Sequence, residues 1–146
     1  MGRRKKAKKR TWNPDPVYGR VDVTRFINHI MRHGKKSLAQ RIFYKAMEIV
    51  KEKTKKDPIL VWEEAIKNVS PQMEVRPERS FSLACRWIIE AARNKKGKPM
   101  FEKLAQEIID AASKRGDAYN RKEMMHKTAE ANKAFAIFAW GKSKKT

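Results

Sequence analysis

Arginines recur at every seventh position in one stretch of the chain. Arg79, Arg86 and Arg93 lie within ERSFSLACRWIIEAARN, and a helix turns by about 100° per residue, so their side chains would point within roughly 40° of one another. Guanidinium groups bind phosphate oxygens through charge-assisted hydrogen bonds. The apolar residues lie on another face of the same helix: Leu83, Ala84, Trp87, Ile88 and Ala91. The spacing therefore predicts a helix with one packing face and one phosphate-binding face.

Further positive charge lies at both ends of the chain and in one short loop. The 146 residues include 36 lysines and arginines against 16 acids, a formal net charge of +20. Residues 1–10 contribute +7 and residues 141–146 contribute +3, which leaves +10 for the part between them. Self-repulsion of this size favours a polyanionic partner, and nucleic acid is the leading class. The further candidate phosphate contacts are Arg3, Arg4, Lys5, Lys6, Lys8, Lys9, Arg10, Lys35 and Lys36.

Aromatic residues near the basic ends are candidates for stacking on unpaired bases. They are Trp12, Tyr18 and Trp140; packing of each ring on the body of the protein is the alternative, and the sequence leaves both open. A DNA reader would be expected to show a recognition helix, zinc-ligand spacing or a basic zipper, and none stands out. Cations spread over several surfaces instead favour a folded RNA, recognised by its shape and its phosphates.

The residue patterns of enzymes, metal sites and exported proteins do not occur in the sequence. No serine, cysteine or threonine stands in a recognisable nucleophile setting, so neither catalysis nor a cofactor is expected. Cys85 and three scattered histidines cannot supply a zinc site, and no metal is expected. A single cysteine, expected to be buried, indicates a reducing, cytoplasmic compartment. The hydrophilic N-terminal run argues against an export signal and against insertion in a membrane.

The stretch HGKKSLAQ has a superficial likeness to a nucleotide phosphate-binding loop. Such a loop needs a glycine where His29 stands, and here a predicted helix precedes it instead of a strand. Ser37 and Gln40 have the spacing of a capping box, in which both side chains bind free amide groups at the start of a helix. The stretch is therefore interpreted as a loop followed by a helix, with Lys35 and Lys36 projecting from the loop.

About six helices must position these side chains. Apolar residues at helical spacing, with capping residues, glycines and prolines at the ends, identify them. The predicted helices run from Asp22 to Gly34, from Ser37 to about Lys53, from Asp57 to before Pro71, from about Arg79 to before Gly97, from Pro99 to Gly116, and from near Asn120 onward. Asp57 before Pro58, and Asn120 with Glu123, are the expected caps of the third and sixth helices.

The predicted fold is a single all-α domain. Residues 1–20 form a basic arm and lead-in, with the arm expected to be disordered until RNA binds; residues 21–140 form a helical RNA-binding body, and residues 141–146 a basic tail. Leu38 and Leu60 are expected to face the core. A seam on the last helix is also expected to pack in the core, with packing on a partner as the alternative: Met124, Thr128, Ala131, Phe135 and Phe138.

Four stretches resemble one known family. DPVYGR, HGKKSLAQRIFYKAMEIVKEKT, LACRWIIEAAR and HKTAEANKAFA are similar, in this order, to bacterial small-subunit ribosomal protein seven. The resemblance implies a monomeric helical body with a projecting β-ribbon that binds the three-prime major domain of small-subunit ribosomal RNA and nucleates assembly of the subunit head. It also implies a location near exit-site tRNA and messenger RNA, beside small-subunit protein eleven. The RNA contacts that it implies are Arg3, Arg4, Arg10, Lys35, Lys36, Arg76 and Arg79.

The chain departs from the resemblance in two places. Relatives carry a β-hairpin between the segments similar to NVSPQMEV and RPERSFSLACRW, and here it is missing around Met73 to Arg76, either lost or omitted from the sequence. Contacts of that hairpin with exit-site tRNA are therefore in question. FAIFAW at 135–140 stands where relatives tend to have a histidine and an arginine among the aromatics.

The hypothesis is a structural ribosomal protein without catalytic activity. One rival is a packaging protein for duplex DNA, which would explain the charge but not the resemblance. The other is a nucleic-acid-processing enzyme with an unrecognised site, which would make a lone acid such as Asp110 or Glu130 indispensable.

Overall fold

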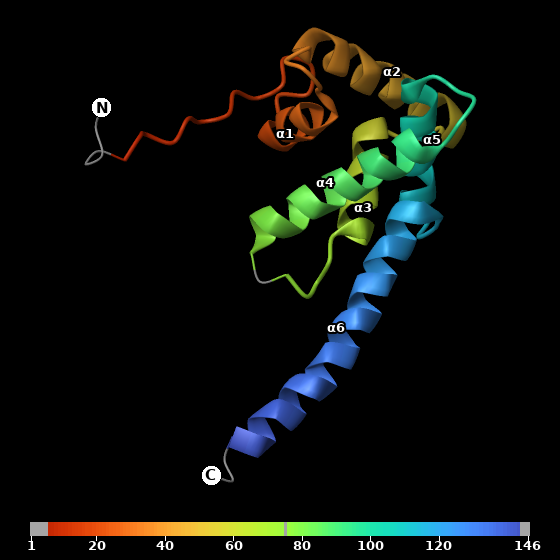
Figure 1. The fold of residues 1–146 in the computed structure, drawn as a ribbon. Helices are drawn as coiled ribbons and strands as arrows, with labels where there is room; N and C mark the ends of the chain where they lie inside the picture. The colour runs from red at the N-terminus through yellow and green to blue at the C-terminus, as the bar shows by residue number, and fades with distance from the viewer. Residues whose placement is uncertain (1–5, 75, 144–146) are drawn as a thin grey trace.

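The structure, a computed structural model, describes residues 6–74 and 76–143, with side chains as far as Phe135. Within these residues it consists of six helices and no strand (Figure 1). They are α1 (Val21–Ile30), α2 (Lys36–Thr54), α3 (Pro58–Val69), α4 (Pro77–Asn94), α5 (Met100–Ala112) and α6 (Gly116–Ser143). The first five pack together, whereas α6 leaves this body and projects away from it (Figure 1). The all-α fold is thus confirmed.

The core forms around α5, which contacts α2, α3, α4 and α6. Leu104 and Ile108 of α5 are fully buried. Beside them, Phe26 of α1, Phe43 of α2 and Trp62 of α3 form an aromatic cluster with ring centroids 5.5–6.2 Å apart. Tilted and edge-on pairs of this kind contribute about 0.5–1.5 kcal/mol each beyond the burial of their surface. The cluster holds α1 and α3 against α2 and fixes the end of the body from which the N-terminal lead-in departs.

The helix starts follow local capping rules in one case and tertiary contacts in others. Asp57 caps α3 as predicted, because its side chain accepts a hydrogen bond from the Ile59 amide at 3.2 Å. The prediction of a capping box at Ser37 and Gln40 is wrong. The helix α2 already begins at Lys36, and Lys35 precedes it without a side-chain cap. The backbone at His33 and Gly34 is left-handed (φ 54° and 72°), and this turn leads directly into the helix. α4 begins at Pro77, two residues before the predicted start.

The start of α6 is also earlier than predicted. Asn120 lies inside the helix, which begins at Gly116. A buried carboxylate of α5 supplies the cap instead: Glu107 Oε1 accepts a hydrogen bond from the Ala118 amide at 3.1 Å. Glu107 Oε2 lies 2.7 Å from Lys95 Nζ in an ion pair. Burial lowers the pKa of Lys95, but the nearby carboxylates of Glu107 and Asp110 outweigh it and raise that pKa.

Two predictions about the core are wrong. Leu38 and Leu60 are exposed on the surfaces of α2 and α3. On α6, the seam side chains within the described range are also exposed, Met124 to 68% and Phe135 to 76%, while Phe138 lies outside that range. The reason is that α6 extends beyond the body, so within the described residues these side chains project away from the other helices (Figure 1). Packing of this seam on another molecule stays a prediction.

A short connection, residues 70–76, joins α3 to α4. Its described residues contain no strand, in agreement with the missing hairpin. The carbonyl of Pro71 accepts a hydrogen bond from Ser80 Oγ at 2.9 Å, and the amide of Gln72 donates to His126 Nε2 of α6 at 3.3 Å. The connection therefore lies against both α4 and α6.

Candidate nucleic-acid interface

Asp15 anchors the lead-in from which the basic arm extends. Its side chain is only 3% exposed. One oxygen accepts hydrogen bonds from the amides of Val17 and Tyr18 at 3.1 and 3.0 Å, and the other accepts from the Tyr44 hydroxyl at 2.6 Å. Thr24 Oγ1 also donates to the carbonyl of Asn13 at 2.8 Å. The sequence DPVYGR thus builds a turn that ties the root of the arm to α1 and α2.

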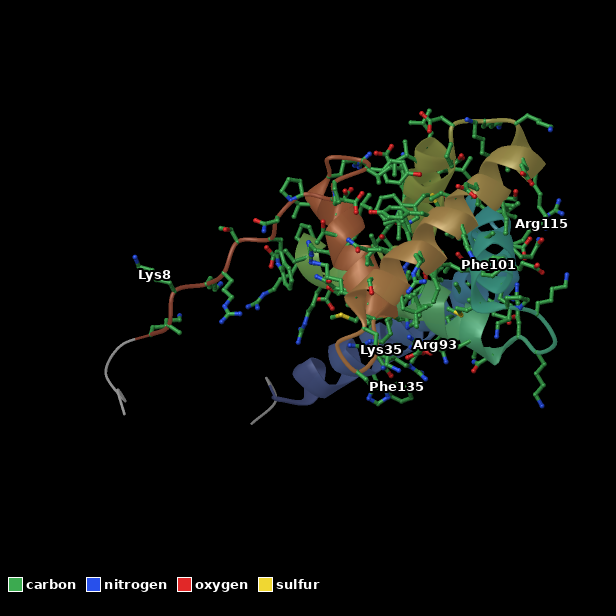
Figure 2. The ribbon with its side chains drawn as sticks, turned by 90° about the horizontal axis from the view of Figure 1, so that it is seen from above. Lys8, Lys35, Arg93, Phe101, Arg115 and Phe135 are labelled. Carbon is green, nitrogen blue, oxygen red and sulfur yellow. The ribbon has the colours of Figure 1, made fainter. Side chains whose placement is uncertain are left out.

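The arm itself carries exposed cations away from the body. Lys6, Lys8, Lys9 and Arg10 are exposed on a segment without regular secondary structure, and Lys8 lies far from the helices (Figure 2). Arg3, Arg4 and Lys5 lie outside the described residues. An extended basic segment of this kind can follow a nucleic-acid backbone without requiring a particular base.

The three arginines of α4 differ in their surroundings. Arg79 and Arg86 are exposed, and Arg79 lies 3.9 Å from the carboxylate of Glu74. Arg93 is half-buried and donates a hydrogen bond to the carbonyl of Ile30 at 3.0 Å, at the C-terminal end of α1. Burial and the charge of Arg32 lower its pKa. Arg93 therefore stabilises the contact between α1 and α4 as well as contributing charge.

Packing of α1 against α4 brings further arginines and a histidine to this face, which the sequence analysis missed. The pKa of His29 is lowered by burial and then by the charges of Arg86 and Arg25, so these groups lie near one another. The guanidinium of Arg25 also lies 4.7 Å from the centroid of the Phe81 ring. Because the spacing within α1 marks only its core face, nothing in the sequence placed these residues beside the arginines of α4. Together the arginines form the α1–α4 cationic band: Arg25, Arg32, Arg79, Arg86 and Arg93. His29 lies among them, and its lowered pKa keeps the imidazole neutral near pH 7.

The two predicted loop lysines lie at the end of the α1–α2 loop, where Lys35 precedes α2 and Lys36 is its first residue. Both are exposed. Lys35 lines a pocket of about 240 Å³ together with Arg32 and Arg93, and Figure 2 shows Lys35 and Arg93 at the same side of the molecule. The exposed side chain of Leu38 lies in the wall of this pocket. Lys36 instead lines a smaller pocket of about 140 Å³ beside Asp15. The loop thus joins the cationic band to the lead-in.

The remaining candidates occupy different environments. Trp12 is exposed beside α1, and Arg76 is exposed at the start of α4. Tyr18 is half-buried, with its ring edge-on to Phe43 at a centroid distance of 6.1 Å. This contact accounts for the ring by packing, and its stacking on a base stays a prediction. The side chain of Trp140 lies outside the described residues.

The carboxylates named by the enzyme alternative have ordinary surroundings. Asp110 lies 3.6 Å from Lys95 and accepts a hydrogen bond from Gln106, and Glu130 is exposed on α6. Burial raises the pKa of the Cys85 thiol, which keeps it protonated and unreactive. Across residues 6–74 and 76–143, no cluster of three His, Cys, Asp or Glu side chains is arranged to hold a metal ion. In the same residues no helix has the length and apolar character to cross a membrane.

Comparison with known proteins points to one family. The sequence model of the family described as "Ribosomal protein S7p/S5e" matches residues 2–78 and 72–133. The chain is 50% identical over 154 residues to "Small ribosomal subunit protein uS7" of Thermotoga maritima, covering 94% of this chain and 99% of that protein. It is 50% identical over 156 residues to the protein of that name from Caldanaerobacter subterraneus, covering 96% and 100%. The protein of that name from Thermosipho africanus is 49% identical over 154 residues, with 94% and 99% covered.

The matches also bear on the short connection before α4. The alignment to the Thermotoga maritima protein takes in 154 positions, although it covers only 94% of a chain of 146 residues. That relative therefore has residues without a counterpart here. The two matched segments of the family model overlap at 72–78, which is where the connection lies and where the sequence analysis placed the missing hairpin.

Proposed function

Because the chain belongs to the ribosomal protein S7p/S5e family, a family of structural and non-enzymatic ribosomal proteins, we propose that it binds the three-prime major domain of small-subunit ribosomal RNA directly. In this role it nucleates assembly of the subunit head. The observation that supports the proposal is the α1–α4 cationic band, in which exposed and half-buried arginines converge from two helices. A rigid array of this kind places positive charges between phosphates of a folded RNA, which can then lie close together although they would otherwise repel one another.

The mechanism predicts a strong dependence on salt. Each phosphate neutralised by a lysine or arginine releases condensed counterions. If the band, the loop lysines and the arm neutralise six or more phosphates, affinity falls by about a thousandfold or more between 50 and 200 mM salt. An affinity that does not change with salt would contradict this mechanism.

Footprinting of the purified protein on whole small-subunit RNA tests the location. We expect protection confined to the three-prime major domain. Protection spread evenly over the RNA would contradict the proposal. A filter-binding assay in which duplex DNA competes as strongly as the ribosomal RNA fragment would also contradict it. Glu130→Ala is a control, because an exposed acid on α6 should have no part in the binding.

The proposed partners in the assembled subunit are small-subunit protein eleven, exit-site tRNA and messenger RNA. The exposed seam of α6 is available for packing on a neighbouring protein. The short connection at 70–76 offers less surface than a hairpin, so we expect its crosslinks to exit-site tRNA to be weaker than those of relatives that carry the hairpin. Crosslinking the same tRNA to subunits that contain this protein and to subunits that contain a relative with the hairpin tests this expectation. Equal crosslinking yields would contradict it.

A further inference from the structure

A groove lies beside the lead-in, between Trp12, α1 and the first turns of α4. Its volume is about 510 Å³, which falls within the range of sites for small organic ligands. Trp12 forms one wall and is 58% exposed. Large aromatic rings usually bury most of their surface. Among the aromatic side chains that the structure describes, Trp12 shares its exposed state with Phe135 of α6, but Trp12 also lines a groove.

The other walls of the groove provide charge and hydrogen bonds. Arg25 comes from the cationic band, His29 contributes a neutral imidazole, and the amide of Asn28 offers both a donor and an acceptor. Glu78 contributes a carboxylate from α4. Arg86 lies near enough to His29 for its charge to act on the imidazole. The groove thus combines an aromatic surface, an amide and the guanidinium of Arg25 on the α1 side with the Glu78 carboxylate on the α4 side.

We propose that this groove takes one unpaired RNA nucleotide, with its base stacked on Trp12 and its phosphate beside Arg25. In a duplex both faces of a base are covered by its neighbours, so only an unpaired base can offer a face to the indole. The amide of Asn28 is suited to the edge of a base, which carries donors and acceptors of its own. The inference rests on the proposed binding of ribosomal RNA and adds that a base, as well as phosphates, is contacted.

Trp12→Ala tests the stacking contact. Loss of one stacked base should lower the affinity for the ribosomal RNA fragment by about 5- to 150-fold. The slope of affinity against salt should stay the same, because no phosphate contact is removed. Trp12→Phe should restore most of the affinity, since a phenyl ring also stacks. Val17→Ala is the matched control, as Val17 is an exposed apolar residue of the same lead-in.

The fluorescence of Trp12 gives a second measurement, which would not change with RNA if Trp12 had only a structural role. The difference between the emission of the wild type and of Trp12→Phe isolates the signal of Trp12, and saturating ribosomal RNA should quench that signal. An unchanged signal, or Trp12→Ala binding as tightly as the wild type, overturns the groove assignment while leaving RNA binding intact. If the wild type itself fails to bind the fragment, the proposed function fails instead.

Discussion

At the scale of single residues, the hydrogen bond between Tyr44 and Asp15 joins α2 to the root of the arm. Burial, followed by this hydrogen bond and the charge of Asp15, raises the pKa of Tyr44 above its ordinary value of 10.0. The folded protein therefore holds the phenol neutral. The contribution of the neutral Tyr44 phenol to the free energy of unfolding is fully present below about pH 10 and is lost as the pH rises further.

Tyr44→Phe should accordingly lower the free energy of unfolding by about 1.5–3 kcal/mol near neutral pH, the usual range for a hydrogen bond to a charged group. The difference between wild type and variant should shrink when denaturant unfolding is repeated near pH 11, where the free phenol is ionised in the unfolded chain. A difference that stays constant over this range would show that the hydroxyl does not act through Asp15.

A substitution at Gly116 tests how closely the chain packs around the buried carboxylate of Glu107. Its φ is +89°, and a Cβ there would lie 2.9 Å from Glu107 Oε1. Gly97 has a similar φ of +84° but nothing within 4 Å of such an atom. Gly97→Ala should therefore cost about 1–2 kcal/mol for the backbone alone. Gly116→Ala should cost about 2–4 kcal/mol, because a steric conflict is added. Equal losses in denaturant unfolding would exclude that conflict.

At the scale of elements, variants of the three α4 arginines distinguish side chains that only bind RNA from one that also stabilises the packing of the helices. Arg79→Gln and Arg86→Gln should each weaken RNA binding and reduce the salt slope by about one, with little change in unfolding. Arg93→Gln should weaken RNA binding and also lower the stability of the fold, because it removes the hydrogen bond to the carbonyl of Ile30. Filter binding at several salt concentrations and thermal unfolding distinguish the two outcomes. Equal stability of all three variants would show that Arg93 has no structural part.

The helices also show what a sequence can reveal by itself. The start of α3 at Asp57 and Pro58 was predictable because the cap lies within two residues of the amide that it binds. The start of α6 was not, since its cap comes from Glu107 on another helix. In the same way, the arginine row follows from spacing within α4. Arg25 and His29 join it only through the packing of α1 on α4, which no local pattern encodes.

At the scale of the whole molecule, a packed body and a projecting helix should respond differently to the same substitution. Phe43 is fully buried in the aromatic cluster, and Phe43→Ala should lower the free energy of unfolding by about 3–5 kcal/mol. Phe135→Ala, on the exposed seam of α6, should change it by less than about 0.5 kcal/mol. Denaturant unfolding of the isolated protein measures both. A large loss for Phe135→Ala would mean that the seam packs within the chain after all.

The way in which α6 leaves the body has a mechanical consequence. With 28 residues the helix is about 42 Å long, and the contacts of its first turns with Glu107 and of His126 with Gln72 set its direction. Residues 127–143 extend beyond the His126 contact as a rod of about 26 Å, so the helix acts as a lever whose pivot is at His126. A tilt of about 5° at the pivot would carry the far end sideways by about 2 Å, at a rise of 1.5 Å per residue. Substitutions at the pivot should therefore misplace whatever docks on the distal turns, even where they leave the docking surface untouched.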